Sequence, residues 1–229
     1  MCGEVGRGSP EAAARFRHRL STLKQNGSNI LVVGTDALPV ACERLLGESD
    51  AKPRRRLLVT TDATPTTARA RLEAVRARTA RDSATILDWD GVSRGTSADG
   101  PGESSVRVAP VEADLDALET AVEEAIETFE ADSGPLSPAE LRVCFDSLTP
   151  LVGEYERRDL RRFLLRLSET VTGVNGMAHY HVSATFDSEV VRSLRPLFDA
   201  VVEVRRDDEQ VEQRWHLVDE DITTEWLPL

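Results

Sequence analysis

The chain has 229 residues and a net charge of −12, from 40 acidic and 28 basic side chains. This length predicts one large domain or two small ones, with a core that needs neither disulfides nor metal. The negative charge disfavours binding to nucleic acid and to anionic membranes. No apolar run approaches the ~20 residues that span a bilayer, and the N-terminus lacks a signal-peptide pattern. We therefore expect a cytoplasmic protein.

The basic residues are unevenly divided. Only Lys24 and Lys52 are lysines among the 28 basic side chains, and the rest are arginines. An acidic excess with almost no lysine is typical of proteins from salt-loving archaea, where a Debye length of ~3 Å at 1 M salt screens the repulsion. An arginine-rich, GC-rich genome of ordinary salinity is the alternative.

Apolar runs alternate with amphipathic stretches along the chain. Strands are expected at 30–33, 56–61, 84–87, 141–146, 177–183, 200–204 and 214–218, and helices at 11–25, 37–46, 66–80, 111–130, 154–171 and 187–195. This alternation indicates βαβ units, an α/β fold and a mostly parallel sheet with helices on both faces. We expect a flexible Gly- and Ser-rich loop over 91–105 and a C-terminal hairpin that turns at 207–209.

The turn after the first strand has the position of a phosphate-binding loop but lacks its residues. In the pattern G-x-x-x-x-G-K-[ST], Gly34 supplies the first glycine. Pro39, Val40 and Ala41 replace the second glycine, the lysine and the hydroxyl residue. Pro39 has no N–H to donate, and neither Val40 nor Ala41 can bind phosphate or Mg²⁺. We expect hydrocarbon to plug the former nucleotide pocket, and we expect no ATP hydrolysis.

Two carboxylates follow predicted strands, at the edge of the sheet where ligands bind in such folds. Asp146 ends the strand 141–146, at the position of a carboxylate that holds Mg²⁺. Asp62 follows the second strand and could align an attacking water. The alternatives are that Gly34 serves only a tight turn, and that Asp146 caps the next segment or pairs with an arginine.

The segment Arg142–Pro150, RVCFDSLTP, precedes an arginine-rich helix and resembles the Walker B region of KaiC-like ATPases of the RecA superfamily. Residues 180–204 are similar to the next strand, helix and final strand of that family, and the resemblance covers about 28–218. It implies a three-layer RecA-like P-loop fold with strand order 5-1-4-3-2. The chain then divides into a tail and helix (1–27), the α/β domain (28–220) and a C-terminal tail (221–229).

The resemblance also implies a vestigial nucleotide site at the carboxyl ends of the strands. Its residues are Gly34, Thr35, Asp62, Asp146, Ser147 and Ser183. We expect a degenerate KaiC-like protein without a cofactor. It would act as a non-catalytic regulatory or scaffold protein in signalling or gene regulation, through a protein partner or self-association. The alternative is an ATPase that binds ATP and Mg²⁺ through an atypical phosphate loop; a DNA-linked regulator is a third possibility, which the charge opposes.

His179 and His181 alternate on one strand and therefore share a face. Zinc suits such a pair, but no third ligand stands at a plausible spacing. Cys2, Cys42 and Cys144 are odd in number and widely separated, so they indicate neither a disulfide framework nor a zinc site. We expect a packed histidine pair whose burial lowers the pKa of both rings.

Two surface features each allow two alternative roles. The helix 154–171 carries five arginines between positions 157 and 166, which either pair with neighbouring carboxylates or dock an acidic partner. The tail that contains Trp226 either packs back on the sheet or serves as an interaction segment.

Overall fold

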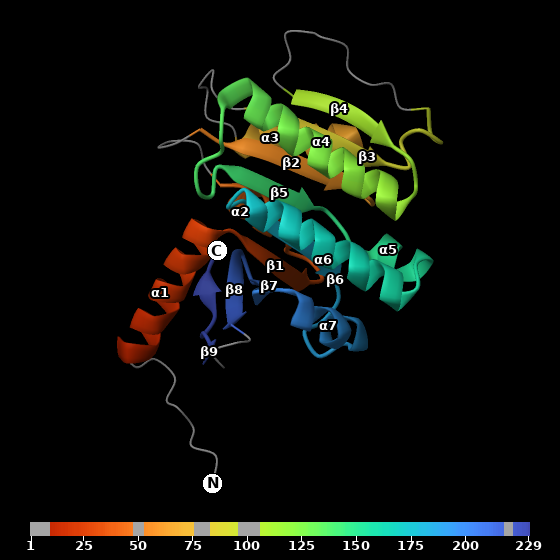
Figure 1. Cartoon of the computed structure of the whole chain (residues 1–229). Helices are drawn as coiled ribbons and strands as arrows, with labels where there is room; N and C mark the ends of the chain where they lie inside the picture. Colours follow the sequence, from red (N-terminus) through yellow and green to blue (C-terminus); the bar gives the residue numbers. More distant parts are fainter. Residues whose placement is uncertain (1–9, 48–52, 76–82, 96–105, 218–221) are drawn as a thin grey trace.

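The computed structural model describes residues 10–47, 53–75, 83–95, 106–217 and 222–229. They form an α/β fold around a mixed, mostly parallel sheet of ten strands (Figure 1). The helices are α1 (Pro10–Asn26), α2 (Leu38–Leu46), α3 (Pro65–Val75), α4 (Leu115–Ser133), α5 (Thr149–Glu154), α6 (Arg157–Gly173), α7 (Glu189–Leu194) and the 3₁₀ helix η1 (Arg195–Leu197). The strands are β1 (Ser28–Gly34), β2 (Arg55–Thr60), β3 (Ser83–Trp89), β4 (Val106–Val111), β5 (Leu141–Phe145), β6 (Met177–Ser183), β7 (Ala200–Asp207), β8 (Gln210–Leu217), β9 (Ile222–Thr223) and β10 (Leu227–Pro228).

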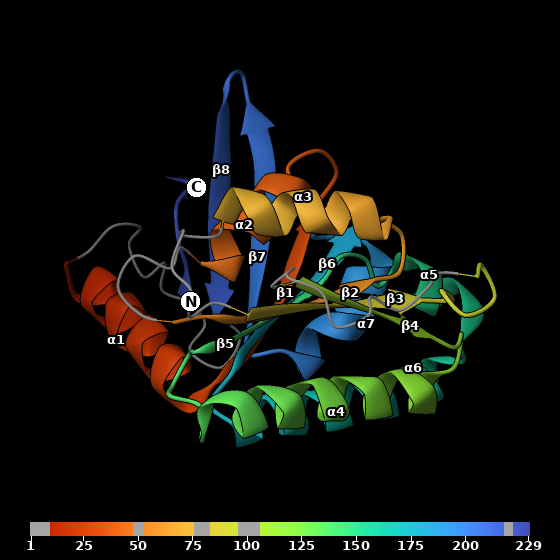
Figure 2. The same ribbon diagram turned by 90° about the horizontal axis from the view of Figure 1, so that it is seen from above.

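Helices cover both faces of the sheet, as predicted. Figure 2 shows α2 and α3 on one side, and α4 and α6 on the other. The residues from Ile30 to Val33 are at most 2% exposed, because both faces of β1 are covered. The apolar stripes of α4 and α6 close the largest core cluster, whereas α1, α2 and α3 close two smaller clusters. In the part of the chain that the structure describes, no helix combines the length and apolarity needed to cross a membrane.

The order of the strands differs from the predicted 5-1-4-3-2. Across the sheet the order is β10, β8, β7, β1, β6, β5, β2, β3 and β4, with β9 paired to β8. The prediction had no strand at β4, where Pro110 and the exposed Arg107 interrupt the apolar pattern. Proline is tolerated there because β4 is an edge strand. Of the predicted flexible loop, residues 91–95 form turns and 96–105 lie outside the described residues.

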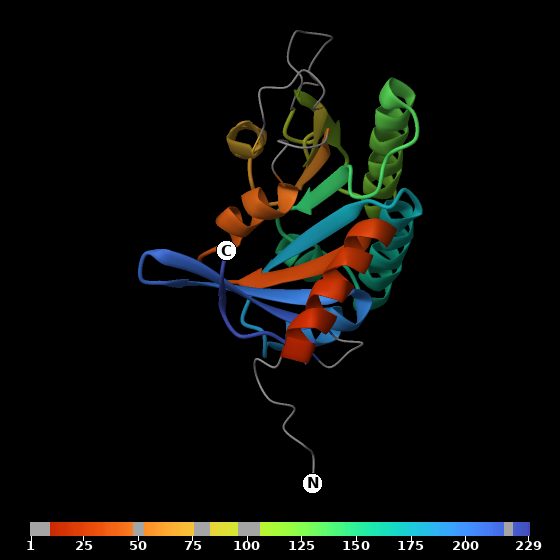
Figure 3. The same ribbon diagram turned by 90° about the vertical axis from the view of Figure 1, so that its left-hand side faces the viewer.

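The C-terminal hairpin is confirmed. β7 and β8 pair antiparallel, and Asp207 lies opposite Gln210 across a two-residue turn. In Figure 3 this blue hairpin reaches beyond the rest of the sheet. The end of the chain packs back on it, because β9 and β10 both pair with β8. The guanidinium groups of Arg205 and Arg214 lie 4.1 and 4.6 Å from the ring centroid of Trp226.

Candidate functional site

The connection between β1 and α2 is too short for a phosphate loop. α2 begins at Leu38, so only residues 35–37 separate it from Gly34. Pro39, which replaces the second glycine of the motif, already lies in the first turn of the helix. Four residues precede that glycine in a phosphate loop, and their backbone N–H groups surround the phosphates. Here the helix replaces part of that loop.

The prediction that hydrocarbon plugs a pocket at this position is wrong. Pro39 is exposed and Val40 is 39% exposed, so neither side chain fills a cavity. Of the three replaced positions only Ala41 is buried, where it joins the core between α2 and the sheet. Helix α2 occupies part of the segment that would form the loop, and two of the three side chains at the motif positions, Pro39 and Val40, are exposed.

Gly34 is required by packing against β7. A Cβ at this position would collide with the carbonyl oxygen of Val204 and lie 2.8 Å from its Cγ2. Gly34 also lies opposite Ser183 in the parallel register of β1 and β6. The side chains of Thr35 and Ser183 are exposed beside it. Gly34 therefore has a structural role that does not involve phosphate.

Asp146 anchors the loop that follows β2. Its Oδ1 accepts hydrogen bonds from the backbone N–H and the hydroxyl of Thr61, at 2.7 and 2.9 Å. Its Oδ2 accepts from the backbone N–H of Ala63 at 2.5 Å. Burial raises the pKa of Asp146, and the N–H donors of this loop oppose that shift. Both carboxylate oxygens thus have protein partners.

Of the two predicted site residues near Asp146, Ser147 makes a structural hydrogen bond and Asp62 faces the solvent. The hydroxyl of Ser147 accepts from the backbone N–H of Thr149 at 3.1 Å and so helps to begin α5. Asp62 is exposed, and no hydrogen bond to its carboxylate is found among the described residues. The six predicted site residues therefore form two groups at the edge of the sheet. Gly34, Thr35 and Ser183 lie at the ends of β1 and β6, while Asp62, Asp146 and Ser147 follow β2 and β5.

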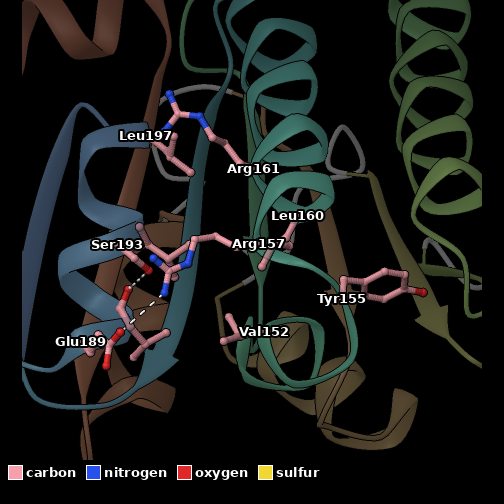
Figure 4. A pocket seen from close by; sticks show the side chains of 10 residues that line it. Val152, Tyr155, Arg157, Leu160, Arg161, Glu189, Ser193 and Leu197 are labelled. Atoms are coloured by element: carbon pink, nitrogen blue, oxygen red, sulfur yellow. Dashed lines mark hydrogen bonds and ion pairs between the residues drawn. The ribbon is translucent and has the colours of Figure 1, made fainter.

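A pocket of about 380 Å³ lies between the start of α6 and the segment α7–η1 (Figure 4). Its aliphatic lining consists of Val152, Leu160, Val190, Leu194 and Leu197. At its rim, Arg157 and Glu189 form an ion pair with an N–O distance of 3.6 Å. Tyr155 turns away from the pocket, and its hydroxyl donates to the carbonyl of Ala113 at 3.0 Å. This pocket was not predicted from the sequence.

The exposed arginines of α6 are only partly paired. Arg162 lies 3.3 Å from Asp159, and Arg166 lies 3.1 Å from a carboxylate oxygen of Glu119 on α4. Within the described residues, Arg158 and Arg161 form no ion pair. Local pairing is therefore confirmed for Arg162 and Arg166, and the docking of an acidic partner stays a prediction.

Four residues that the sequence analysis kept apart meet in the core. They are Cys42 of α2, Cys144 of β5, and His179 and His181 of β6, all at most 2% exposed. One potential ligand atom from each lies within 4.8 Å of the others. The sequence shows no third ligand at a plausible spacing, but the fold brings both cysteines next to the histidines from other elements.

The electrostatics of this cluster follow from its burial. Burial and the positive charge of Arg71 lower the pKa of His181 to about 3. Burial, His181 and Arg142 lower the pKa of His179 well below its ordinary value. The predicted direction for the histidines is confirmed. Burial also raises the pKa of the Cys144 thiol. The imidazoles are therefore unprotonated and able to bind a metal.

Comparison with known proteins identifies a family whose function is unknown. A model of a family of unknown function (DUF7504) matches residues 27–204, which extend from the start of β1 into β7. This span includes every residue of the predicted nucleotide site and of the Cys–His cluster. No curated protein matches the chain.

Proposed function

The chain belongs to the DUF7504 family, and we propose that it is a non-catalytic regulatory or scaffold protein on a RecA-like, KaiC-like core. It binds a protein partner in signalling or gene regulation and does not turn over ATP. The hydrogen bonding of Asp146 carries this proposal. In an ATPase this carboxylate faces Mg²⁺, whereas here both oxygens accept hydrogen bonds from residues 61–63.

The arrangement of the middle strands supports a RecA-like origin. The neighbouring strands β7, β1, β6, β5 and β2 follow the order that the resemblance implies when β3 and β4 are counted as additions at the edge. Gly34 and Asp146 then stand at the carboxyl ends of β1 and β5, where a nucleotide-binding ancestor would have held phosphate and metal.

The charge at this edge supports the loss of nucleotide binding. Residues 34–41 contain no lysine or arginine, and Asp36 and Asp62 are both exposed there. Phosphoryl transfer depends on positioning and on neutralising the charge of the phosphates. A three-residue loop without a cation supplies neither.

The surface formed by the arginine face of α6 and the adjacent pocket supports the binding of an acidic partner segment. The guanidinium fork of Arg158 or Arg161 matches a carboxylate, and Arg is enriched where binding energy concentrates. The pocket beside them offers an aliphatic lining for one side chain of the partner. We therefore propose a partner segment that carries carboxylates next to a bulky aliphatic residue.

A photo-crosslinking amino acid at position 161 tests this proposal. In the native host it should capture one specific protein, whereas the same group at the exposed Arg17 of α1 should not. With that protein purified, the double change R158E and R161E should weaken binding roughly tenfold or more, equivalent to about 1.4 kcal/mol. The matched change R17E should leave the affinity unaltered. Equal affinity for the double variant and the unmodified chain would refute this docking surface.

A further inference from the structure

Four side chains of the kind that bind zinc meet inside the protein, from three separate elements. Cys42 projects from α2, Cys144 from β5, and His179 and His181 from β6. We propose that these four residues form a structural zinc site that fastens α2 to the sheet. The proposal is independent of the proposed function, because it concerns the core and not the edge of the sheet or α6.

The set of donors selects zinc. Two thiolates and two imidazoles in a tetrahedron are typical of structural zinc sites, which have four protein ligands and no open position. Mg²⁺ and Ca²⁺ prefer oxygen ligands, which this cluster lacks. Two thiolates also cancel the charge of Zn²⁺, so that a fully buried site carries no net charge. The four residues are between 0% and 2% exposed, and this neutrality is what such burial requires.

The backbone geometry brings the donors together. Cys144 and His179 are direct neighbours in the parallel register of β5 and β6. His181 lies two residues further along β6 on the same face, and the two rings stack with centroids 5.1 Å apart. Cys42 reaches the cluster from the face of the sheet that α2 covers, because it lies on the buried side of that helix. No change of fold is needed to assemble the site.

The two nitrogen donors have nearly the spacing of a tetrahedral site, whereas the two sulfur atoms lie closer together than such a site requires. His179 Nδ1 and His181 Nε2 are 3.0 Å apart, and the two Sγ atoms are 2.6 Å apart. Zinc–ligand bonds of 2.0–2.1 Å to nitrogen and 2.3 Å to sulfur require separations of about 3.3 and about 3.8 Å. Side-chain rotations that move the sulfurs apart by about 1 Å therefore open the site for the metal.

The ring of His179 offers one nitrogen to a metal. Its Nδ1 lies 3.0 Å from Nε2 of His181 and takes that role. Nε2 of His179 then remains the buried N–H of the ring, without a hydrogen-bond partner in the part of the chain that the structure describes.

The site explains how a short helix is held. α2 has nine residues, and its N-cap residue Ala37 provides no side-chain hydrogen bond. A zinc bond through Cys42 fixes it to β5 and β6, which lie far away in the sequence; 102 residues separate Cys42 from Cys144. In this account the metal stabilises the structure at the edge where the phosphate loop has been lost.

Metal analysis of the full chain tests the proposal. Protein produced in zinc-supplemented medium should carry one zinc per chain by elemental mass spectrometry, and a strong chelator should lower its melting temperature. C42S and C144S should each lose the zinc. C2S, which removes a thiol outside the described residues, should retain it and serves as the matched control.

A cobalt titration keeps the test independent of whether the variants fold. The chain stripped of metal should bind one Co²⁺ and develop the visible bands of tetrahedral cobalt, together with thiolate charge-transfer absorption, and Zn²⁺ should displace it. Two results would overturn the proposal. One is two free thiols, no zinc and no cobalt spectrum, which indicates a packed core. The other is an intact mass lower by two hydrogen atoms without bound metal, which indicates a disulfide between Cys42 and Cys144.

Discussion

The backbone N–H of Ala63 donates to Oδ2 of Asp146 at 2.5 Å, although 83 residues separate them in the chain. This contact joins the loop after β2 to the end of β5. A carboxylate at this position invites comparison with a metal-binding residue of an ATPase. Its hydrogen bonds instead give it the role of organising the loops at the carboxyl edge of the sheet.

Replacing Asp146 with asparagine should destabilise the protein. D146N puts an NH₂ group, which is a donor, where Oδ2 now accepts from Ala63, so one buried donor loses its acceptor. We expect a loss of about 2 kcal/mol in the free energy of unfolding, measured by urea denaturation. D62N is the matched control, because that carboxylate is exposed, and it should change stability by less than about 0.5 kcal/mol. An unchanged stability for D146N would show that the loop does not depend on this carboxylate.

Replacing Gly34 with alanine should also destabilise the fold. The added Cβ meets the backbone carbonyl of Val204, which cannot move without shifting β7. Overpacking of this kind costs about 1–3 kcal/mol, measurable as a lower urea midpoint. In the control G153A the new Cβ meets no atom within 4 Å, and the change should be neutral or slightly stabilising. If G34A is as stable as the unmodified chain, β1 and β7 do not approach each other so closely that a Cβ is excluded at position 34.

The hydroxyl of Tyr180 should contribute to stability. It is buried and donates to Oδ1 of Asn29 at 2.9 Å, linking β6 to β1. Y180F leaves this acceptor without its donor and should cost about 1–2 kcal/mol in chemical denaturation. Y155F removes a hydroxyl that bonds at the surface to Ala113, so its effect should be smaller. The reverse order of the two losses would contradict this assignment.

The hairpin carboxylate of Glu203 should make stability depend on pH. It accepts hydrogen bonds from Arg214 Nε at 2.7 Å and His216 Nε2 at 2.8 Å. Burial raises the pKa of Glu203, but the bonds from His216 and Arg214 outweigh this and hold it below the ordinary value of 4.5. A lowered pKa in the folded state gives stability that is present above pH 4.5 and lost as the pH falls through the folded pKa.

Denaturation at several pH values measures this effect. The free energy of unfolding should fall less steeply below pH 4.5 in E203Q than in the unmodified chain. E209Q, which changes an exposed carboxylate in the turn of the same hairpin, should keep the original slope. The same slope in E203Q and the unmodified chain would exclude Glu203 as the source.

Much of the fold could be predicted because the buried strands are continuous apolar runs. The runs in β1 and β7 are covered on both faces and therefore stand out from their surroundings. β4 was missed because its pattern is that of an edge strand, with Pro110 inside it. α4 begins at Leu115 because Asp114 caps it, accepting from the N–H groups of Asp116 and Ala117. A prediction based on the apolar stripe alone placed that start four residues too early.

The Cys–His cluster could not be predicted from spacing. The rule applied to the sequence looks for ligands close together in the chain, whereas Cys144 and His179 become neighbours only through the register of two parallel strands. A usable signal was present: His179 and His181 share a face of an apolar strand, and Cys144 occupies the middle of another. Once β5 and β6 are taken as neighbouring strands, Cys144 lies beside His179 and becomes the third potential ligand.

Isothermal titration with Mg-ATP tests the central claim most directly, because the claim is that the carboxyl edge of this sheet no longer holds a nucleotide. We predict no saturable heat on titrating the full chain with Mg-ATP at millimolar concentration, and no release of phosphate. Saturable binding at micromolar concentration that is lost in D146N, while the folded state of that variant is retained, would contradict it.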